Sequence, residues 1–198
     1  MKNKYIVKTI TVLIILIATG NAAMAQTRFE IGESRDNMMV LSGSSPSHEW
    51  SVKTKTVTGT AQFDLVPGND IIRLDSLKFS LPTLQLNSSK KVSDKNSRKN
   101  LKANKFKYIT YQLTKAKVID EKEYVYQIAT TGNLTIDGIT KEVNMDMYFF
   151  ANKNGSITCT GKYTLKMIDY HAATPSFMGG LMSTGETVLL DFSLRFER

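Results

Sequence analysis

The chain has very little of the residues that most often carry out chemistry or cross-link small proteins. Its 198 residues include one cysteine, two histidines and one tryptophan. A single cysteine excludes a disulfide framework within the chain and the Cys-x-x-Cys pairs of redox and zinc sites. With 41% hydrophobic residues, 12 glycines and 4 prolines, the composition is not that of a disordered or collagen-like chain. The length fits one domain better than two.

Motifs of common enzymes are also missing, including a Gly-x-Ser-x-Gly elbow and a glycine-rich phosphate loop. His48 and His171 lie far apart, and only Asp169 provides an acid close to His171. Cys159 falls on the apolar face of an expected strand, where burial would raise its pKa and leave it unreactive. We therefore predict no catalytic residue and no metal site. A hydrolase that uses His48, Asp169 and His171 is kept as the least favoured alternative.

One long hydrophobic run occurs, and it lies at the N-terminus. Residues 10–18 are apolar except for Thr11, three lysines precede them within the first eight residues, and Ala23-Met24-Ala25 follows. The run is too short to cross a bilayer, which needs about 20 helical residues. These are the features of a secretory signal peptide. We predict cleavage near Ala25, an exported mature domain over residues 26–198 that is periplasmic or secreted, and a formal charge that falls from +8 to +5 with the three lysines.

The rest of the chain alternates between apolar and polar residues with the period of two that is typical of half-buried strands. The alternation is clearest over 157–167 and recurs over 124–136, 143–149 and 188–196. Asp137-Gly138 separates two such runs and predicts a type I′ hairpin turn. The apolar face changes phase between Trp50 and Val57, which predicts a bulge or bend near Thr56.

These patterns predict an all-β fold, an antiparallel barrel of about eight strands with one short helical insertion. Closing the sheet removes its unpaired edges, and about eight strands leave an interior that side chains fill or one small ligand occupies. The insertion is placed within residues 88–107, where Ser93 would cap a helix that runs towards Ala103.

The same segment, 88–107, is strongly basic, with eight lysines and arginines against one aspartate. We predict no nucleic-acid partner, because aromatic residues are not interleaved with these bases. Two interpretations remain: a merely solvated segment, or peripheral contact with an anionic membrane. The residues expected to touch lipid headgroups are Lys95, Arg98, Lys99 and Lys102.

The inward faces of the expected strands supply candidates for contact with a ligand, although periodicity does not separate a packed interior from a hollow one. Flexible methionines among aromatic residues suit an adaptable apolar site. The candidates for the interior are Trp50, Phe79, Tyr126, Ile128, Met145, Met147, Tyr163 and Phe192. The candidates for the mouth of the barrel are His48, Tyr170 and Phe177.

Five stretches of the sequence resemble, in the same order, segments of the YceI-like family. The most specific, Gly132-Asn-Leu-Thr-Ile-Asp-Gly-Ile-Thr-Lys141, is similar to the family's Gly-x-Leu-Thr-Ile-x-Gly-Val-Thr-Lys hairpin. The others are the Ser-x-x-His-Glu-Trp opening within 41–50, the Leu-Lys segment at 101–111, the Pro-containing loop at 169–179 and the final strand at 185–194.

This resemblance implies a lipocalin-like barrel that is exported in bacteria and is not an enzyme. It also implies an elongated isoprenoid, quinone-like or fatty lipid in the barrel lumen, with no cofactor besides such a lipid. The alternative is a surface or stress-related interaction module whose lumen is filled by side chains. The oligomeric state is left open, with a homodimer among the options.

Overall fold

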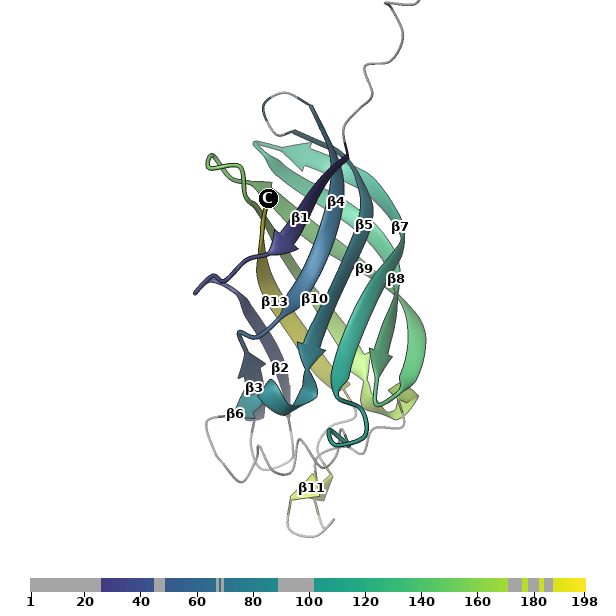
Figure 1. Ribbon diagram of the computed structural model, residues 1–198. Coiled ribbons are helices and arrows are strands. Elements are labelled where there is room, and N and C mark those ends of the chain that lie inside the picture. The colour runs from purple at the N-terminus through teal and green to yellow at the C-terminus, as the bar shows by residue number, and fades with distance from the viewer. Residues whose placement is uncertain are drawn as a thin grey trace, which may run out of the picture.

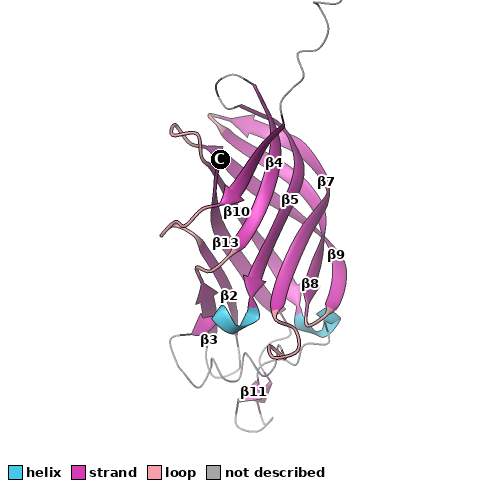
Figure 2. Ribbon diagram, viewed as in Figure 1, coloured by secondary structure: helices cyan, strands magenta, loops and turns pink. Residues whose placement is uncertain are grey.

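The computed structural model describes residues 26–44, 49–66, 68, 70–88, 102–170, 176–177, 182–183 and 187–198. These residues are almost entirely strand, with two short 3-10 turns at the lower end of the view (Figure 2). The strands are β1 Gln26–Ile31, β2 Met38–Ser44, β3 Glu49–Thr54, β4 Thr58–Val66, β5 Asp70–Pro82, β6 Asn87–Ser88, β7 Tyr108–Lys122, β8 Val125–Ile136, β9 Ile139–Ala151, β10 Ile157–Lys166, β11 Ser176–Phe177, β12 Met182–Ser183 and β13 Thr187–Glu197, and the turns are η1 Thr83–Gln85 and η2 Met167–Tyr170. The expected signal peptide lies outside the described residues.

Eight antiparallel strands form a closed barrel, as the sequence predicted. Their order is β1-β4-β5-β7-β8-β9-β10-β13, and pairing between β13 and β1 closes the ring. Strand β13 also pairs with β2, to which β3 and then β6 are added. The turns β4–β5, β7–β8 and β9–β10 therefore lie at the upper end in Figure 1, and η1, η2 and the β8–β9 turn lie at the lower end.

The bend predicted near Thr56 is confirmed. Strand β3 ends at Thr54 and β4 begins at Thr58, and the buried positions change from Val52 and Thr54 to Val57 and Ala61. The Thr56 amide donates to Thr54 Oγ1 at 3.0 Å. Because of this bend, β4 pairs with β1 and β5, whereas β3 pairs with β2 and β6.

The predicted type I′ turn is confirmed as well. Asp137 and Gly138 have φ angles of 52° and 78°, and Ile136 pairs with Ile139 on either side of them. Both central residues of a type I′ turn need positive φ, which Gly adopts without steric cost.

The described end of the basic segment is a turn rather than a helix. The amides of Lys105 and Phe106 donate to the carbonyl of Lys102 at 2.8 and 3.0 Å. Lys102 also forms an ion pair with the buried carboxylate of Asp137. The expected helix therefore does not extend to Ala103, which lies in this turn. Residues 89–101 lie outside the described residues. No helix in the described residues is long and apolar enough to cross a membrane.

Candidate ligand-binding interior

The upper half of the barrel is filled by aromatic side chains. The rings of Phe29 and Phe63 meet edge to face at 5.5 Å, and those of Phe63 and Phe149 do so at 5.6 Å. All three side chains are fully buried. We call these three residues the upper cluster. Edge-to-face contacts add to the stability gained from burial, so the upper cluster acts as a packed core.

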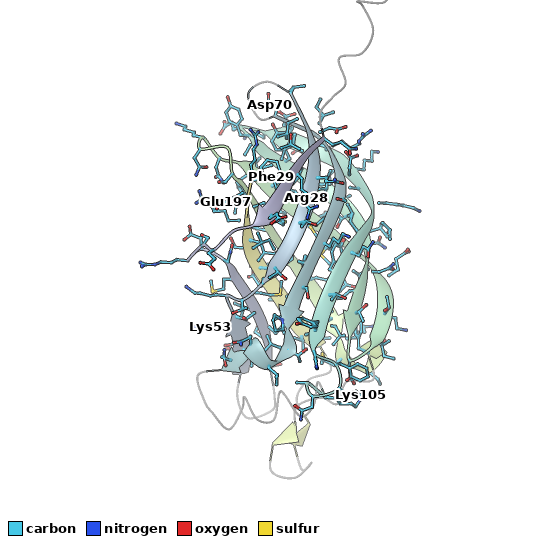
Figure 3. All side chains as sticks on the ribbon, in the orientation of Figure 1. Arg28, Phe29, Lys53, Asp70, Lys105 and Glu197 are labelled. Atoms are coloured by element: carbon cyan, nitrogen blue, oxygen red, sulfur yellow. The ribbon has the colours of Figure 1, made fainter. Side chains whose placement is uncertain are left out.

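A polar contact closes the same end. The buried hydroxyl of Tyr126 donates to Asp70 Oδ1 at 3.0 Å, and Asp70 begins β5 at the top of the view in Figure 3. Burial first, and then the hydrogen bond to Asp70, raise the pKa of Tyr126 to about 12. The hydroxyl is therefore protonated at neutral pH and remains a hydrogen-bond donor.

An aromatic layer crosses the middle of the interior. Phe79 of β5 stacks on Tyr111 of β7, with ring centroids 5.0 Å apart and planes 16° apart, and also lies 5.9 Å from Phe192 of β13. Strands β5 and β13 are three places apart in the barrel, so the second contact spans the interior. We call Phe79, Tyr111 and Phe192 the aromatic layer; it separates the upper cluster from the lower half.

Two glycines make room for this layer. A Cβ atom built on Gly132 would lie 2.5 Å from the Tyr111 hydroxyl oxygen, and one on Gly161 would lie 2.5 Å from Cζ of Phe192. Both distances are shorter than any ordinary contact between such atoms. The rings of Tyr111 and Phe192 therefore lie close against the backbones of the neighbouring strands, β8 and β10.

The lower half of the interior, which we call the lower lumen, is lined by aliphatic and methionine side chains between the aromatic layer and η1 and η2. All of the following are buried: Leu81, Ile109, Leu134, Ile136, Val143, Met145, Leu165, Met167, Val188 and Leu190. These buried side chains are all apolar, so few groups in this half could direct a polar ligand.

The buried hydroxyls of Thr130 and Tyr111 are paired within the protein. The hydroxyl of Thr130 donates to the carbonyl of Met145 at 2.8 Å and accepts a hydrogen bond from Tyr111 at 3.3 Å. Burial raises the pKa of the Tyr111 hydroxyl. It also raises the pKa of Tyr170 in η2, to about 12. These groups are neutral at physiological pH, so they can face an apolar chain.

The buried tyrosines give a prediction for alkaline solution. An unfolded tyrosine ionises near pH 10, whereas Tyr126 and Tyr170 ionise near 12 in the folded protein. Because the folded pKa is raised, this contribution to stability is complete below about pH 10 and is lost as the pH rises through about 12. We expect circular dichroism to report unfolding in this window, together with tyrosinate absorbance. Tyr126→Phe should move the midpoint upwards, and an unchanged midpoint would contradict the assignment.

A comparison with protein families assigns the fold. The model of the YceI-like domain matches residues 25–196, which is nearly the whole chain. The chain belongs to the YceI-like family. Among proteins with curated descriptions, none matches this YceI-like chain.

Solved structures share the YceI-like architecture. A polyisoprenoid binding domain from Saccharophagus degradans, implicated in plant cell wall breakdown, superposes with a TM-score of 0.64 at 11% identity and covers 87% of this chain and 99% of its own. BcnA of Burkholderia cenocepacia gives 0.59 at 16% identity, with 80% and 95% covered. The YceI protein of Campylobacter jejuni gives 0.57 at 21% identity, with 73% and 83% covered. At these identities the likeness shows the fold.

The candidate ligand residues of the YceI-like barrel are distributed over its height. Phe79 and Phe192 belong to the aromatic layer, and Met145 and Tyr163 lie in the lower half. Tyr126, Ile128 and Met147 lie in the upper half, and each is fully buried. Period-two alternation predicted that these seven residues face inwards on β5, β8, β9, β10 and β13, and six of them are buried, but it did not predict their position along the barrel axis.

The candidates for the mouth are only partly described. Tyr170 is buried in η2 with 2% of its surface exposed. Only the backbones of Trp50 in β3 and Phe177 in β11 are described, and His48 lies outside the described residues. The structure therefore gives no position for these three side chains.

Residues that the sequence did not single out include Tyr111 and Thr130. Tyr111 has the same parity as the buried Ile109 in β7, so the alternation there could have revealed it. Thr130 has the same parity as the buried Tyr126 and Ile128 in β8, and its hydrogen bonds satisfy its hydroxyl there.

The residues considered for catalysis are not gathered by the described part of the structure. Asp169 is exposed in η2, and both histidines lie outside the described residues. Cys159 is buried with its sulfur 4.0 Å from that of Met147, and burial raises the pKa of the thiol, which leaves it unreactive. Within the described ranges, no group of three or more His, Cys, Asp or Glu side chains is placed to hold a metal ion.

Proposed function

We propose that the protein is an exported, non-enzymatic carrier that sequesters an elongated apolar lipid, such as an isoprenoid, in the lower lumen. The observation that carries this proposal is a closed barrel whose upper half is plugged by aromatic rings and whose lower half is lined by aliphatic side chains. Each methylene transferred from water to such a lining gains about 0.8 kcal/mol. The similar fold of a domain described as polyisoprenoid binding supports the same ligand class.

The features of the first 25 residues support export. A basic start, a short apolar run and Ala23-Met24-Ala25 are what signal peptidases recognise. Mass spectrometry of the protein recovered from culture would then show Gln26 as the first residue.

We place the lipid below the aromatic layer. Met145 and Tyr163 would contact the chain, and Phe79 and Phe192 would close the site from above. Tyr126, Ile128 and Met147 would belong to the packed upper half rather than to the ligand site. A quinone-like or fatty chain fits the same lining, because no described side chain of the lower lumen selects a particular polar group.

One observation favours a second function, that of an interaction module. Tyr148 and Phe150 of β9 point outwards with 40% and 37% of their surfaces exposed, and Ile119 and Tyr124 nearby are exposed by 47% and 62%. Exposed apolar surface of this kind often marks a contact with another protein. In this alternative the lower lumen would be filled by its own side chains.

A pair of adjacent substitutions separates the two functions. Leu190 faces the lower lumen and is buried, whereas Leu189 faces outwards. If the lumen takes up lipid, Leu190→Trp should lower the affinity for geranylgeraniol by at least about tenfold and leave the melting temperature nearly unchanged. Leu189→Trp should bind as the wild type does.

If the lumen is filled, the result reverses. Leu190→Trp would then overpack the interior and destabilise the fold by about 1–3 kcal/mol. Together with wild-type protein that carries no lipid in native mass spectrometry after gentle purification, this outcome would overturn the carrier function and favour the interaction module.

A further inference from the structure

The wall of the barrel is interrupted between β9 and β10. Their pairing runs from Ile157 opposite Ala151 to Gly161 opposite Met147 and ends there. Beyond that point β9 still pairs with β8 as far as Ile139, and β10 still pairs with β13 as far as Lys166. We call the unpaired stretch, residues 139–146 facing 162–166, the side window.

Charged side chains at the side window bond to the strands on either side of it rather than across it. If the pairing continued, Lys162 would lie opposite Asp146. Instead Lys162 forms an ion pair with Asp191 at 3.1 Å, and Asp146 accepts a hydrogen bond from Gln127 at 3.1 Å. Lys162 is thus neutralised on its own side of the window, and Asp146 is hydrogen-bonded on the other.

The burial of β10 changes at the same place. Its inward residues Gly161 and Leu165 are buried, but Tyr163 between them is only partly buried. Tyr163 has lost the cover that a paired β9 would give it. Tyr163 is therefore the partly exposed inward residue at the side window, whereas Met145 of β9 and Leu165 of β10 are buried.

A cleft of about 1040 Å³ lies along the side window. It is lined by the inward residues Met145 and Tyr163 and by their outward neighbours Asp146 and Lys162. Successive residues of a strand point to opposite faces, so contact with the partly exposed Tyr163 brings the edge of the cleft to the inward face of β10. Its size is in the range of small-molecule sites.

The outer part of the cleft carries uncommitted positive charge. Lys115 and Lys117 of β7 line it, together with Thr131 of β8, which pairs with Lys115. Both lysines are exposed, and among the described residues neither forms an ion pair. They are two positions apart on one face, about 7 Å along the strand, so both ammonium groups can reach one anion. Of the two aspartates of the cleft, Asp191 is paired with Lys162, and Asp146 accepts a hydrogen bond from the neutral side chain of Gln127.

We propose that the side window is a ligand site and a lateral entrance to the lower lumen. The apolar chain of the lipid passes between Met145 and Tyr163, and an anionic headgroup, a phosphate or a carboxylate, binds Lys115 and Lys117 in the outer cleft. This inference rests on the proposed carrier function and adds to it the charge of the ligand and the route by which it enters.

Two probes with the same chain test the headgroup. We expect geranylgeranyl phosphate to bind more tightly than geranylgeraniol, and Lys115→Gln/Lys117→Gln to weaken only the phosphate, by about tenfold. The control, Lys53→Gln/Lys55→Gln, removes two lysines with the same spacing near the lower end of the barrel, where Figure 3 labels Lys53. Excess inorganic phosphate should not displace the lipid, because the chain supplies most of the affinity.

The outcomes are distinguishable. If neither probe binds the wild type, the carrier function fails. If both probes bind the wild type and the Lys115/Lys117 variant binds them equally well, only the side-window site is refuted. The same conclusion follows if the Lys53/Lys55 variant, rather than the Lys115/Lys117 variant, loses affinity for geranylgeranyl phosphate. Displacement of the lipid by inorganic phosphate would also overturn a lipid headgroup site.

Bridging the side window tests the route. Asp146→Cys/Lys162→Cys can be joined across the gap by a short bis-maleimide, and the buried Cys159 should not react. We expect the bridged protein to take up geranylgeranyl phosphate from vesicles at least about tenfold more slowly than the same variant capped with N-ethylmaleimide, since closure removes the path. Equal uptake rates would contradict a lateral entrance.

Discussion

Phe63→Ala is expected to lower the free energy of unfolding by about 4 kcal/mol. Phe63 is fully buried and touches both other rings of the upper cluster, Phe29 and Phe149. Truncation would remove its burial and both edge-to-face contacts and leave a cavity between strands from opposite sides of the barrel. Urea unfolding followed by circular dichroism measures the change.

The outward-facing Phe150 provides the control. Its ring is 37% exposed on β9, next in sequence to Phe149, so Phe150→Ala should change stability by less than about 1 kcal/mol. Where the Phe63 variant is still folded, its affinity for geranylgeraniol should stay near that of the wild type. A large loss of affinity would instead place the lipid in the upper half.

Gly132→Ala is expected to destabilise the protein by about 3 kcal/mol. The new methyl group would lie 2.5 Å from the Tyr111 hydroxyl oxygen and 2.7 Å from the backbone carbonyl oxygen of Gln112. The ring can move only by leaving its stack with Phe79, and the carbonyl oxygen belongs to the paired β7. The aromatic layer would therefore be disturbed even where the barrel survives.

A second glycine separates close approach from backbone strain. Gly155 has a φ angle of 83° in the β9–β10 turn, and a Cβ atom there would meet nothing within 4 Å. Gly155→Ala should therefore lower the free energy of unfolding by only about 1 kcal/mol, the penalty for a non-glycine residue in the left-handed conformation. Equal melting temperatures for the two variants would show that the approach of Tyr111 to Gly132 does not matter.

The strands and the turns of the barrel could be predicted because they depend on local patterns. Alternation over 157–167 identified the inward face of β10, and Asp137-Gly138 specified the turn between β8 and β9. The change of phase after Trp50 located the bend between β3 and β4. Each of these depends on the geometry of a few consecutive residues. Burial then followed from the closure of the sheet.

The division of the interior could not be predicted in the same way. Tyr126 and Tyr163 both face inwards, yet one is at the plugged end and the other beside the side window, because height is set by the registers of several strand pairs together. The early end of the β9–β10 pairing is likewise invisible in two strands that each alternate regularly. Lys115 and Lys117 are candidates for ligand binding only because they line the cleft, which the sequence does not reveal.

The closure of the ring by the first and last strands has a consequence for how the chain folds. Glu30 pairs with Glu197, and the amide of Arg195 donates to Asn37 Oδ1 at 2.8 Å, so these contacts join residues from the two ends of the domain. Contacts of such long range are formed slowly, because the loop between them must be ordered first. Strands β1, β10 and β2 each pair with β13. Until residues 187–197 have been synthesised, these three strands have unpaired edges that can pair with other chains. A chain that loses its last strand would therefore aggregate rather than form a smaller barrel.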